Sequence, residues 1–151
     1  MRAWVGLRGP VLREWSCVLE LQLEADGKRL ELASSGDGAY RKHFLKLDGL
    51  GVRDLLVLGD DLLILADPTM GHDGPRSIWR CKNGAKANAS SASPADRVIA
   101  LPQRQGNDRP EGMTLFELGG SSTSVLVVFD TPSAERLVGP ATVLADIYRL
   151  P

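Results

Sequence analysis

Apolar residues occur along the chain in short runs that turn-forming residues separate. Each run is rich in Val, Ile, Leu and aromatic residues and is bounded by Gly, Asp, Asn or Pro, a pattern that is typical of β-strands. The expected strands cover residues 4–7, 16–23, 40–47, 52–58, 62–66, 76–82, 97–101, 113–118, 124–129 and 143–150. Long helical periodicity is absent. Because period-2 runs dominate, the sequence predicts an all-β protein.

Two stretches of the chain repeat one pattern, at residues 51–68 and 111–132. In each copy two apolar strands flank a Gly-containing turn, and the second strand stops at Asp-Pro or Asp-Thr-Pro. A further strand follows each copy and places an aromatic residue beside arginine, as Trp79-Arg80 and Tyr148-Arg149. Four-stranded antiparallel sheets that recur along a sequence are typical of β-propeller blades.

The repeat predicts one segment, residues 1–151, of blade-like units at about residues 1–47, 51–102 and 111–151. We expect the first unit to lack an inner strand ahead of Trp4 and the last to lack its outer strand. That leaves about two and a half four-stranded antiparallel blades of a partial β-propeller, whereas a closed ring needs about four to eight. Residues 84–95 are small, polar and low in complexity, which indicates a flexible insertion.

Charge and hydropathy narrow the range of partners. The formal net charge is −1 and basic residues are spread along the chain, so we expect no nucleic-acid partner. No run approaches the about 20 apolar residues that span a bilayer. Arg8, Gly9 and Pro10 interrupt the place where a signal peptide has its apolar centre. These features predict no membrane partner and a cytoplasmic location.

Charged residues are expected to gather at one end of the predicted sheets. If the first strand of a blade leaves one rim and the second returns to it, the start of one and the end of the other share that rim. This rim would carry Arg8, Arg53, Asp54, Asp67, Thr69, Glu111 and Asp130. Arginine clamps anionic groups and carboxylates suit hard cations. The ligand-binding candidates are therefore Arg8, Arg53, Asp54 and Glu111, and a Ca²⁺ or Mg²⁺ ion would be held by Glu111, Asp54 and Asp130.

Each of these residues also has a structural interpretation. Asp67 and Asp130 stand before Pro or Thr-Pro, where a carboxylate commonly accepts backbone N–H donors of a turn. Arg53 and Asp54 are equally interpreted as a structural pair that bridges neighbouring blades, because buried charges are normally paired. The aromatic residues alternate within strands and are interpreted as core or blade-interface residues. The isolated Cys17, Cys81, His43 and His72 indicate neither a metal site nor a catalytic pair.

Several motifs can be compared with a known family. They are GLRGPVL at residues 6–12, YRKHFLKLDGLGVRD at 40–54, DDLLILADPTM at 60–70 with DGP at 73–75, and ADIYRLP at 145–151. Together they closely resemble the bacterial DUF3616 family over almost the whole chain. The resemblance implies a β-propeller of unknown function that is longer than this chain. It also implies that blades ahead of Trp4 are missing, so that the chain is the C-terminal portion of a longer propeller, a truncated reading frame, or a chain that completes its sheets by oligomerising.

Two functions remain open at this point. The chain contains no G-x-S-x-G, H-E-x-x-H or P-loop motif, which favours a non-catalytic scaffold that binds a ligand or a protein. The alternative is a metal-assisted hydrolase of a phosphoester or lactone, in which the rim carboxylates hold the ion and Arg53 or Arg8 polarises the substrate. Incomplete blades would also expose sheet edges, so we expect self-association.

Overall fold

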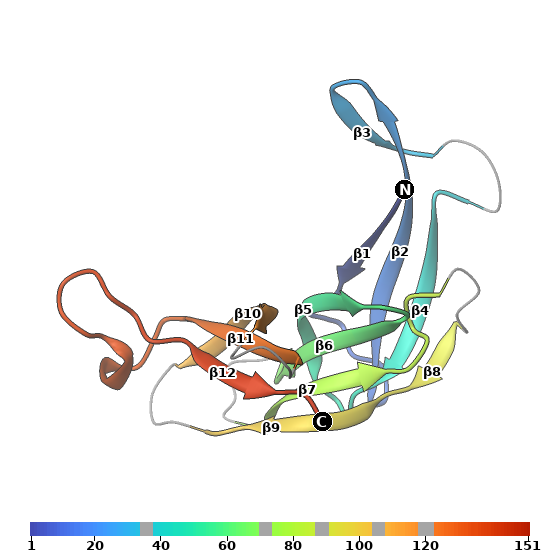
Figure 1. Cartoon of the computed structure of the whole chain (residues 1–151). Coiled ribbons are helices and arrows are strands. Elements are labelled where there is room, and N and C mark those ends of the chain that lie inside the picture. The colour runs from blue at the N-terminus through green and yellow to red at the C-terminus, as the bar shows by residue number, and fades with distance from the viewer. Residues whose placement is uncertain (34–37, 70–73, 87–90, 104–107, 118–122) are drawn as a thin grey trace.

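The computed structural model describes residues 1–33, 38–69, 74–86, 91–103, 108–117 and 123–151, and strands dominate them (Figure 1). The strands are β1 (Arg2–Gly6), β2 (Trp15–Asp26), β3 (Arg29–Leu32), β4 (Tyr40–Lys46), β5 (Gly51–Leu58), β6 (Asp61–Asp67), β7 (Arg76–Cys81), β8 (Ala92–Pro94), β9 (Asp96–Leu101), β10 (Arg109–Glu117), β11 (Thr123–Asp130) and β12 (Asp146–Arg149), with a 3-10 helix η1 (Ala134–Arg136). The all-β prediction is confirmed. The part of the chain that the structure describes contains no helix that is long and apolar enough to cross a membrane.

The strands form three open sheets. The first sheet has the order β1-β2-β4-β8, with β3 paired to the far end of β2. The second has the order β5-β6-β7-β9, antiparallel throughout, and the third has the order β10-β11-β12. Along each of these three orders, the strands lie in the order in which they occur in the sequence, with the first strand at one edge.

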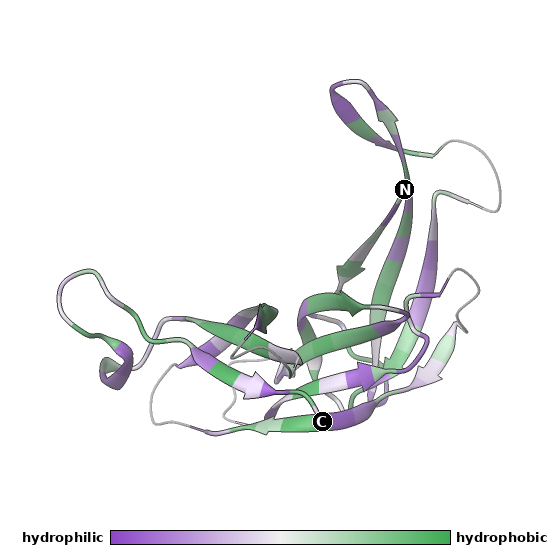
Figure 2. Ribbon diagram, in the orientation of Figure 1, coloured by the Kyte–Doolittle hydropathy of each residue, from purple (hydrophilic) through white to green (hydrophobic). Residues whose placement is uncertain are grey.

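The second sheet lies between the other two and packs one face against each. Successive side chains of a strand point to opposite faces, and β6 supplies both cores. Leu62 and Ile64 belong to the cluster shared with the first sheet, whereas Leu63 and Leu65 belong to the cluster shared with the third. All four are at most 2% exposed, and Figure 2 shows the hydrophobic run along β6. A strand that is apolar on both faces thus fixes a three-layer stack.

The first strands of the three sheets, β1, β5 and β10, lie in a row, and β5 contacts both of the others. The Val52 N–H donates a hydrogen bond to the Leu7 carbonyl at 3.3 Å. A Cβ on Gly6 would come within 2.2 Å of the Val52 Cγ1 atom, so glycine is needed for this close approach. Among the described residues no strand precedes β1 in the first sheet, and β1, which contains Trp4, lies beside β5.

The outer strand of the first sheet comes from an unexpected segment. Residues 92–94, in the insertion predicted to be flexible, form β8, which pairs in parallel with β4. The Phe44 N–H donates to the Ser91 carbonyl at 2.7 Å. The chain therefore leaves the second sheet after β7, adds one strand to the first sheet and returns for β9. Residues 87–90 of the insertion, and Leu118 at the end of a predicted strand, lie outside the described residues.

Two further strands differ from the sequence prediction. The pattern did not indicate β3, which forms a hairpin with β2 that projects beyond the other sheets (Figure 1). The strand expected at residues 143–150 begins only at Asp146. The preceding residues instead bond to the segment around η1, since Val143 pairs with Leu137 and the Leu144 N–H donates to the Arg136 carbonyl at 2.9 Å.

A buried arginine ties this segment to the third sheet. The Arg136 side chain is 2% exposed and its Nε donates to both Asp108 carboxylate oxygens at 2.6 and 2.8 Å. Its two terminal nitrogens donate to the Asp146 carboxylate at 2.9 and 2.7 Å, and its guanidinium carbon lies 3.5 Å from the centre of the Phe129 ring. Hydrogen bonding to Asp146 and then to Asp108 raises the pKa of Arg136 above its ordinary value. The guanidinium therefore remains charged in its buried position.

Candidate functional site

The structure brings three of the predicted rim residues together where β5 meets β10. The Arg53 side chain is 2% exposed and forms an ion pair through Nε with Asp67, which is 4% exposed. Its Nη1 donates to Glu111 Oε1 at 2.9 Å and its Nη2 to the Pro68 carbonyl at 3.3 Å. One arginine thus joins the end of β6, in the second sheet, to the start of β10, in the third.

Asp54, in β5, makes a second link between the second sheet and β10 of the third sheet. Its Oδ2 accepts a hydrogen bond from the Met113 N–H at 2.6 Å, and its Oδ1 accepts one from the Leu55 N–H at 2.8 Å. Both strands carry a bulge here, between Val52 and Asp54 in the pairing of β5 with β6 and between Pro110 and Gly112 in that of β10 with β11. Bulges re-aim side chains, and these two direct Asp54 and Arg53 across the boundary between sheets.

Arg8 and Asp130, the other rim candidates, are not part of this network. The Arg8 side chain is exposed. Only the Arg8 backbone approaches the rim, because its carbonyl oxygen would lie 2.2 Å from a Cβ atom added to Gly51. Asp130 is exposed, and its Oδ1 accepts the Thr131 N–H at 2.8 Å. The Asp130 carboxylate thus accepts a backbone N–H of its own turn, as the sequence indicated. Asp67, for which the same turn contact was expected, forms an ion pair with Arg53.

The rim carboxylates already accept hydrogen bonds from the protein. Glu111 accepts from Arg53, and Asp54 accepts two backbone N–H groups. Among the described residues, no group of three or more His, Cys, Asp or Glu side chains is placed to hold a metal ion. The contacts of Arg53 and Asp54 therefore match the bridging interpretation, although each residue bridges to the third sheet rather than pairing with the other.

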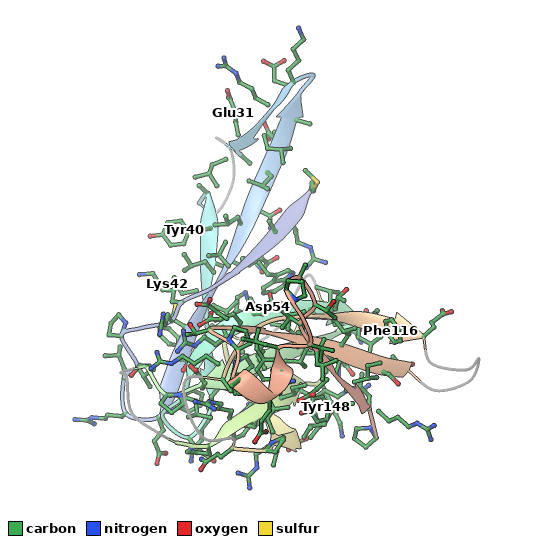
Figure 3. The ribbon with its side chains drawn as sticks, turned by 90° about the vertical axis from the view of Figure 1, so that its left-hand side faces the viewer. Glu31, Tyr40, Lys42, Asp54, Phe116 and Tyr148 are labelled. Carbon is green, nitrogen blue, oxygen red and sulfur yellow. The ribbon has the colours of Figure 1, made fainter. Side chains whose placement is uncertain are left out.

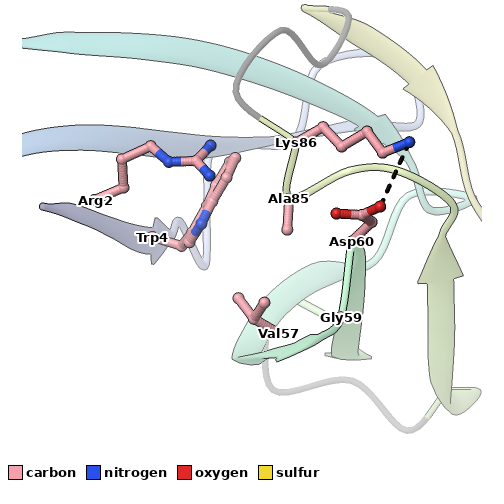
Figure 4. A pocket seen from close by; sticks show the side chains of 7 residues that line it. All are labelled: Arg2, Trp4, Val57, Gly59, Asp60, Ala85 and Lys86. Atoms are coloured by element: carbon pink, nitrogen blue, oxygen red, sulfur yellow. Dashed lines mark ion pairs between the residues drawn. The ribbon is translucent and has the colours of Figure 1, made fainter.

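A cleft lies at another place, between the first and second sheets (Figure 4). Its lining consists of Arg2, Trp4, Val57, Gly59, Asp60, Ala85 and Lys86, and its volume is about 430 Å³. Arg2 and Trp4 come from β1, on one side of the opening. Lys86 and Asp60 face them from the loop after β7 and the turn after β5, and form an ion pair at 3.4 Å.

Two buried side chains, Glu20 and His43, lie behind the Trp4 side of the cleft. Glu20, in β2, has a 1% exposed side chain and accepts a hydrogen bond from Arg2 Nη1 at 3.3 Å and from Gln22 Nε2 at 3.3 Å. The His43 Nε2 lies 2.9 Å from the other Glu20 oxygen, and the His43 ring is 5.2 Å from the Trp4 ring, centre to centre. This support orients both Arg2 and the indole toward the cleft.

The loop that carries Lys86 is anchored by Asp61. The Asp61 carboxylate accepts the Asn83 N–H at 2.8 Å and the Arg80 Nε–H at 2.6 Å. The Ala85 N–H donates to the Asp60 carbonyl at 2.9 Å. The hydrogen bond from the Asn83 backbone, together with Arg80, holds the pKa of Asp61 below its ordinary value. The ionised Asp61 carboxylate therefore stabilises the loop that carries Lys86.

Replacing Asp61 with asparagine is expected to lower the free energy of unfolding at pH 7 by about 1–2 kcal/mol, the contribution of hydrogen bonds to a charged group. Because the folded-state pKa lies below the unfolded one, this contribution is present above the ordinary pKa of 3.8 and is lost as pH falls through the folded-state pKa. Thermal unfolding from pH 7 to pH 3 measures the difference between wild type and variant. The exposed Asp60→Asn is the control, and a difference that persists undiminished at pH 3 would contradict the assignment.

No sequence motif indicated the cleft. Its charged and aromatic residues come from three separate segments. Trp4, interpreted as a core or blade-interface aromatic residue, is half-buried and packs against the cluster shared by the first and second sheets. Of the two cysteines, Cys81 is buried and Cys17 is half-buried, and burial raises the pKa of both thiols. Trp4 lies beside His43 only because β1 pairs with β2 and β2 pairs with β4, and sequence periodicity leaves this strand order open.

Comparison with known proteins identifies the family. The model of the family described as protein of unknown function (DUF3616) matches residues 1–146. The chain therefore belongs to this family, as the motifs at residues 6–12, 40–54, 60–70, 73–75 and 145–151 predicted. No curated protein and no solved structure matches it.

Proposed function

We propose that this DUF3616 protein is a propeller-type binding scaffold and that it binds a small planar anion in the cleft between its first two sheets. The propeller-type arrangement is supported by the row of first strands β1, β5 and β10 and by the face-to-face packing of the three sheets. In a propeller the blades likewise repeat around an axis. The second sheet, with four antiparallel strands in sequence order, is the most complete blade-like unit.

The observation that carries the binding proposal is that the Trp4 indole, the Arg2 guanidinium and the Lys86 ammonium line one opening (Figure 4). Aromatic faces bind planar groups, and arginine and lysine bind anionic ones. The volume of about 430 Å³ is in the range of small-molecule sites. Asp60 keeps Lys86 extended across the opening until an anion takes the place of its carboxylate.

A binding role is favoured over a catalytic one by the chemistry of the lining. Covalent and general-base mechanisms need a nucleophile or a base within reach of the substrate. Among the described lining residues only the Asp60 carboxylate and the Lys86 amine are of these kinds, and they form an ion pair with each other at 3.4 Å. The rim carboxylates that would hold an ion in a hydrolase accept hydrogen bonds from the protein instead.

Phenyl phosphate is the probe for this site because it combines a planar ring with an anion. We expect it to bind in titration calorimetry more tightly than either inorganic phosphate or phenol alone. Lys86→Gln is expected to weaken binding about tenfold, the loss of one charge-assisted hydrogen bond. Trp4→Leu is expected to weaken it similarly, since a stacking contact with an aromatic ring contributes about 0.5–1.5 kcal/mol.

Trp15→Leu is the matched control, because Trp15 is half-buried like Trp4 but does not line the cleft. The proposal is wrong if phenyl phosphate does not bind to the folded protein, or if Lys86→Gln and Trp4→Leu bind it as the wild type does. Equal affinities for phosphate and phenyl phosphate would contradict the part of the proposal that concerns the indole.

A further inference from the structure

A buried histidine lies directly behind the lining of the cleft. Figure 3 shows Tyr40 and Lys42 on the same side of β4, and His43 points to the opposite side because successive side chains of a strand alternate. The His43 side chain is 5% exposed, and its Nε2 lies 2.9 Å from Oε2 of Glu20, whose side chain is 1% exposed. The other Glu20 oxygen accepts a hydrogen bond from Arg2 Nη1 at 3.3 Å. One carboxylate therefore connects His43 to an arginine that lines the cleft.

Several charged side chains surround this histidine. Those described on its face of the first sheet, or across the cleft from it, are Arg2, Glu20, Arg41, Asp60 and Lys86. Arg41 lies opposite Glu20 in the pairing of β4 with β2, but it is exposed, so salt and water screen its charge. Asp60 and Lys86 form an ion pair with each other at 3.4 Å. The charges of Glu20 and Arg2 therefore act most directly on the histidine ring.

The contact with Glu20 determines where the His43 ring takes up a proton. A carboxylate only accepts hydrogen bonds, so His43 Nε2 carries a proton and donates it to Glu20. A second proton then goes to Nδ1 and makes the ring a cation. Histidine is the side chain that ordinarily makes this change between about pH 8 and pH 5. Protonation leaves the contact intact, because Nε2 donates to Glu20 in both forms of the ring.

Protonation changes the charge that the cleft presents to a ligand. While His43 is neutral, the charges of Arg2 and Glu20 cancel, and Arg2 is the cation that compensates the buried carboxylate. When His43 is protonated, these three residues have one net positive charge, and Glu20 has a second cationic partner. The hydrogen bond from Arg2, at 3.3 Å, is longer than the about 2.7–2.9 Å of strong charge-assisted hydrogen bonds. The Arg2 guanidinium is then more available to an anion in the cleft.

We propose that the cleft binds its anion together with a proton on His43, so that the affinity for the anion rises as pH falls. The positively charged cluster attracts the anion, and the bound anion stabilises the protonated ring in turn, because the coupling of two binding events is reciprocal. His43 is not among the described residues that line the cleft, so it acts through Glu20 and Arg2 as a positioning residue. This inference rests on the anion binding proposed above and adds its regulation.

The test measures the affinity of benzenesulfonate by titration calorimetry at pH 8 and pH 5.5. Benzenesulfonate combines a planar ring with an anion whose charge is constant over this range, whereas a phosphate ester loses its second proton at about pH 6. We expect the wild type to bind it about fivefold or more tightly at pH 5.5 than at pH 8. His43→Gln, whose amide can still donate to Glu20, should bind it equally at both pH values. His72→Gln changes the other histidine of the chain and, as the control, should keep the pH dependence.

Proton NMR of the His72→Gln protein provides a second measurement, which does not depend on the folding of His43→Gln. His43 is then the remaining histidine of the chain, and its ring signal should titrate at a higher pH in the protein saturated with benzenesulfonate than in the free protein. A titration that does not move, equal wild-type affinities at the two pH values, or a pH dependence that persists in His43→Gln overturns this inference alone. If neither benzenesulfonate nor phenyl phosphate binds at either pH, the proposed function fails and this inference fails with it.

Discussion

Replacing Arg136 with methionine is expected to lower the free energy of unfolding by about 3–5 kcal/mol, the range for removing one partner of a buried ion pair. Both Asp108 and Asp146 lose the guanidinium that joins them, and Asp108 is itself 2% exposed. Methionine preserves the contact of an unbranched side chain with Phe129, so that the change isolates the charge. For a chain of this size the midpoint of thermal unfolding should fall by roughly 10 °C.

Two comparisons make this result specific. Arg136→Lys keeps the charge but not the planar fork that serves two carboxylates, so its midpoint should lie between those of wild type and the methionine variant. Arg29→Met removes an exposed arginine of β3 and should change stability by less than about 0.5 kcal/mol. Hydrogen exchange should show the loss first in residues 133–146, which Arg136 connects to the third sheet. A methionine variant as stable as Arg29→Met would contradict the assigned role of Arg136.

The strands were predictable because their burial is regular. β6 is apolar on both faces and β2 alternates between a buried inner and a half-buried outer face, and both patterns are visible in the sequence as runs of Leu, Val and Ile. Glycine and aspartate then mark the turns between strands. Each of the ten expected runs overlaps a strand of the structure, with boundaries that differ by a few residues.

The strands that periodicity missed have other causes. β3 is exposed at every residue and exists because a two-residue turn returns the chain along β2. β8 consists of Ala, Ser and Pro, residues that do not favour strands, and exists because β4 offers an edge far away in the sequence. Hairpin geometry and non-local pairing determined these strands, and neither leaves a hydrophobic pattern.

The candidate sites, like the strands, were only partly predictable from the sequence. Strand ends share a rim by topology, so the meeting of Arg53, Asp54 and Glu111 could be predicted from the repeat. Their partners could not, because the two bulges of β5 and β10 decide which side chain crosses between sheets. The cleft of Trp4 and Lys86 depends on how the first and second sheets pack, and no local motif records that packing.

Replacing Arg53 with methionine is expected to have an effect of similar size, about 3–5 kcal/mol. Asp67, 4% exposed, would lose its cationic partner, and the link from β6 to Glu111 of the third sheet would be broken. Arg53→Lys should recover only part of the loss, since one ammonium does not reproduce a fork that reaches Asp67, Glu111 and the Pro68 carbonyl together. Chemical denaturation of the three proteins measures this order.

Glu111→Gln separates the two halves of the Arg53 network. Glu111 is 34% exposed, so water can solvate the partners that remain and the loss should be about 1 kcal/mol or less. If the rim were a stabilised structural link, Arg53→Met would therefore far exceed Glu111→Gln in its effect on stability. If the two variants proved equal and small, the ion pair with Asp67 would not be holding the sheets together. Arg53 would then be available to bind an anion at the rim, as the sequence first suggested, and phosphate binding by the wild type but not by Arg53→Met would establish that role.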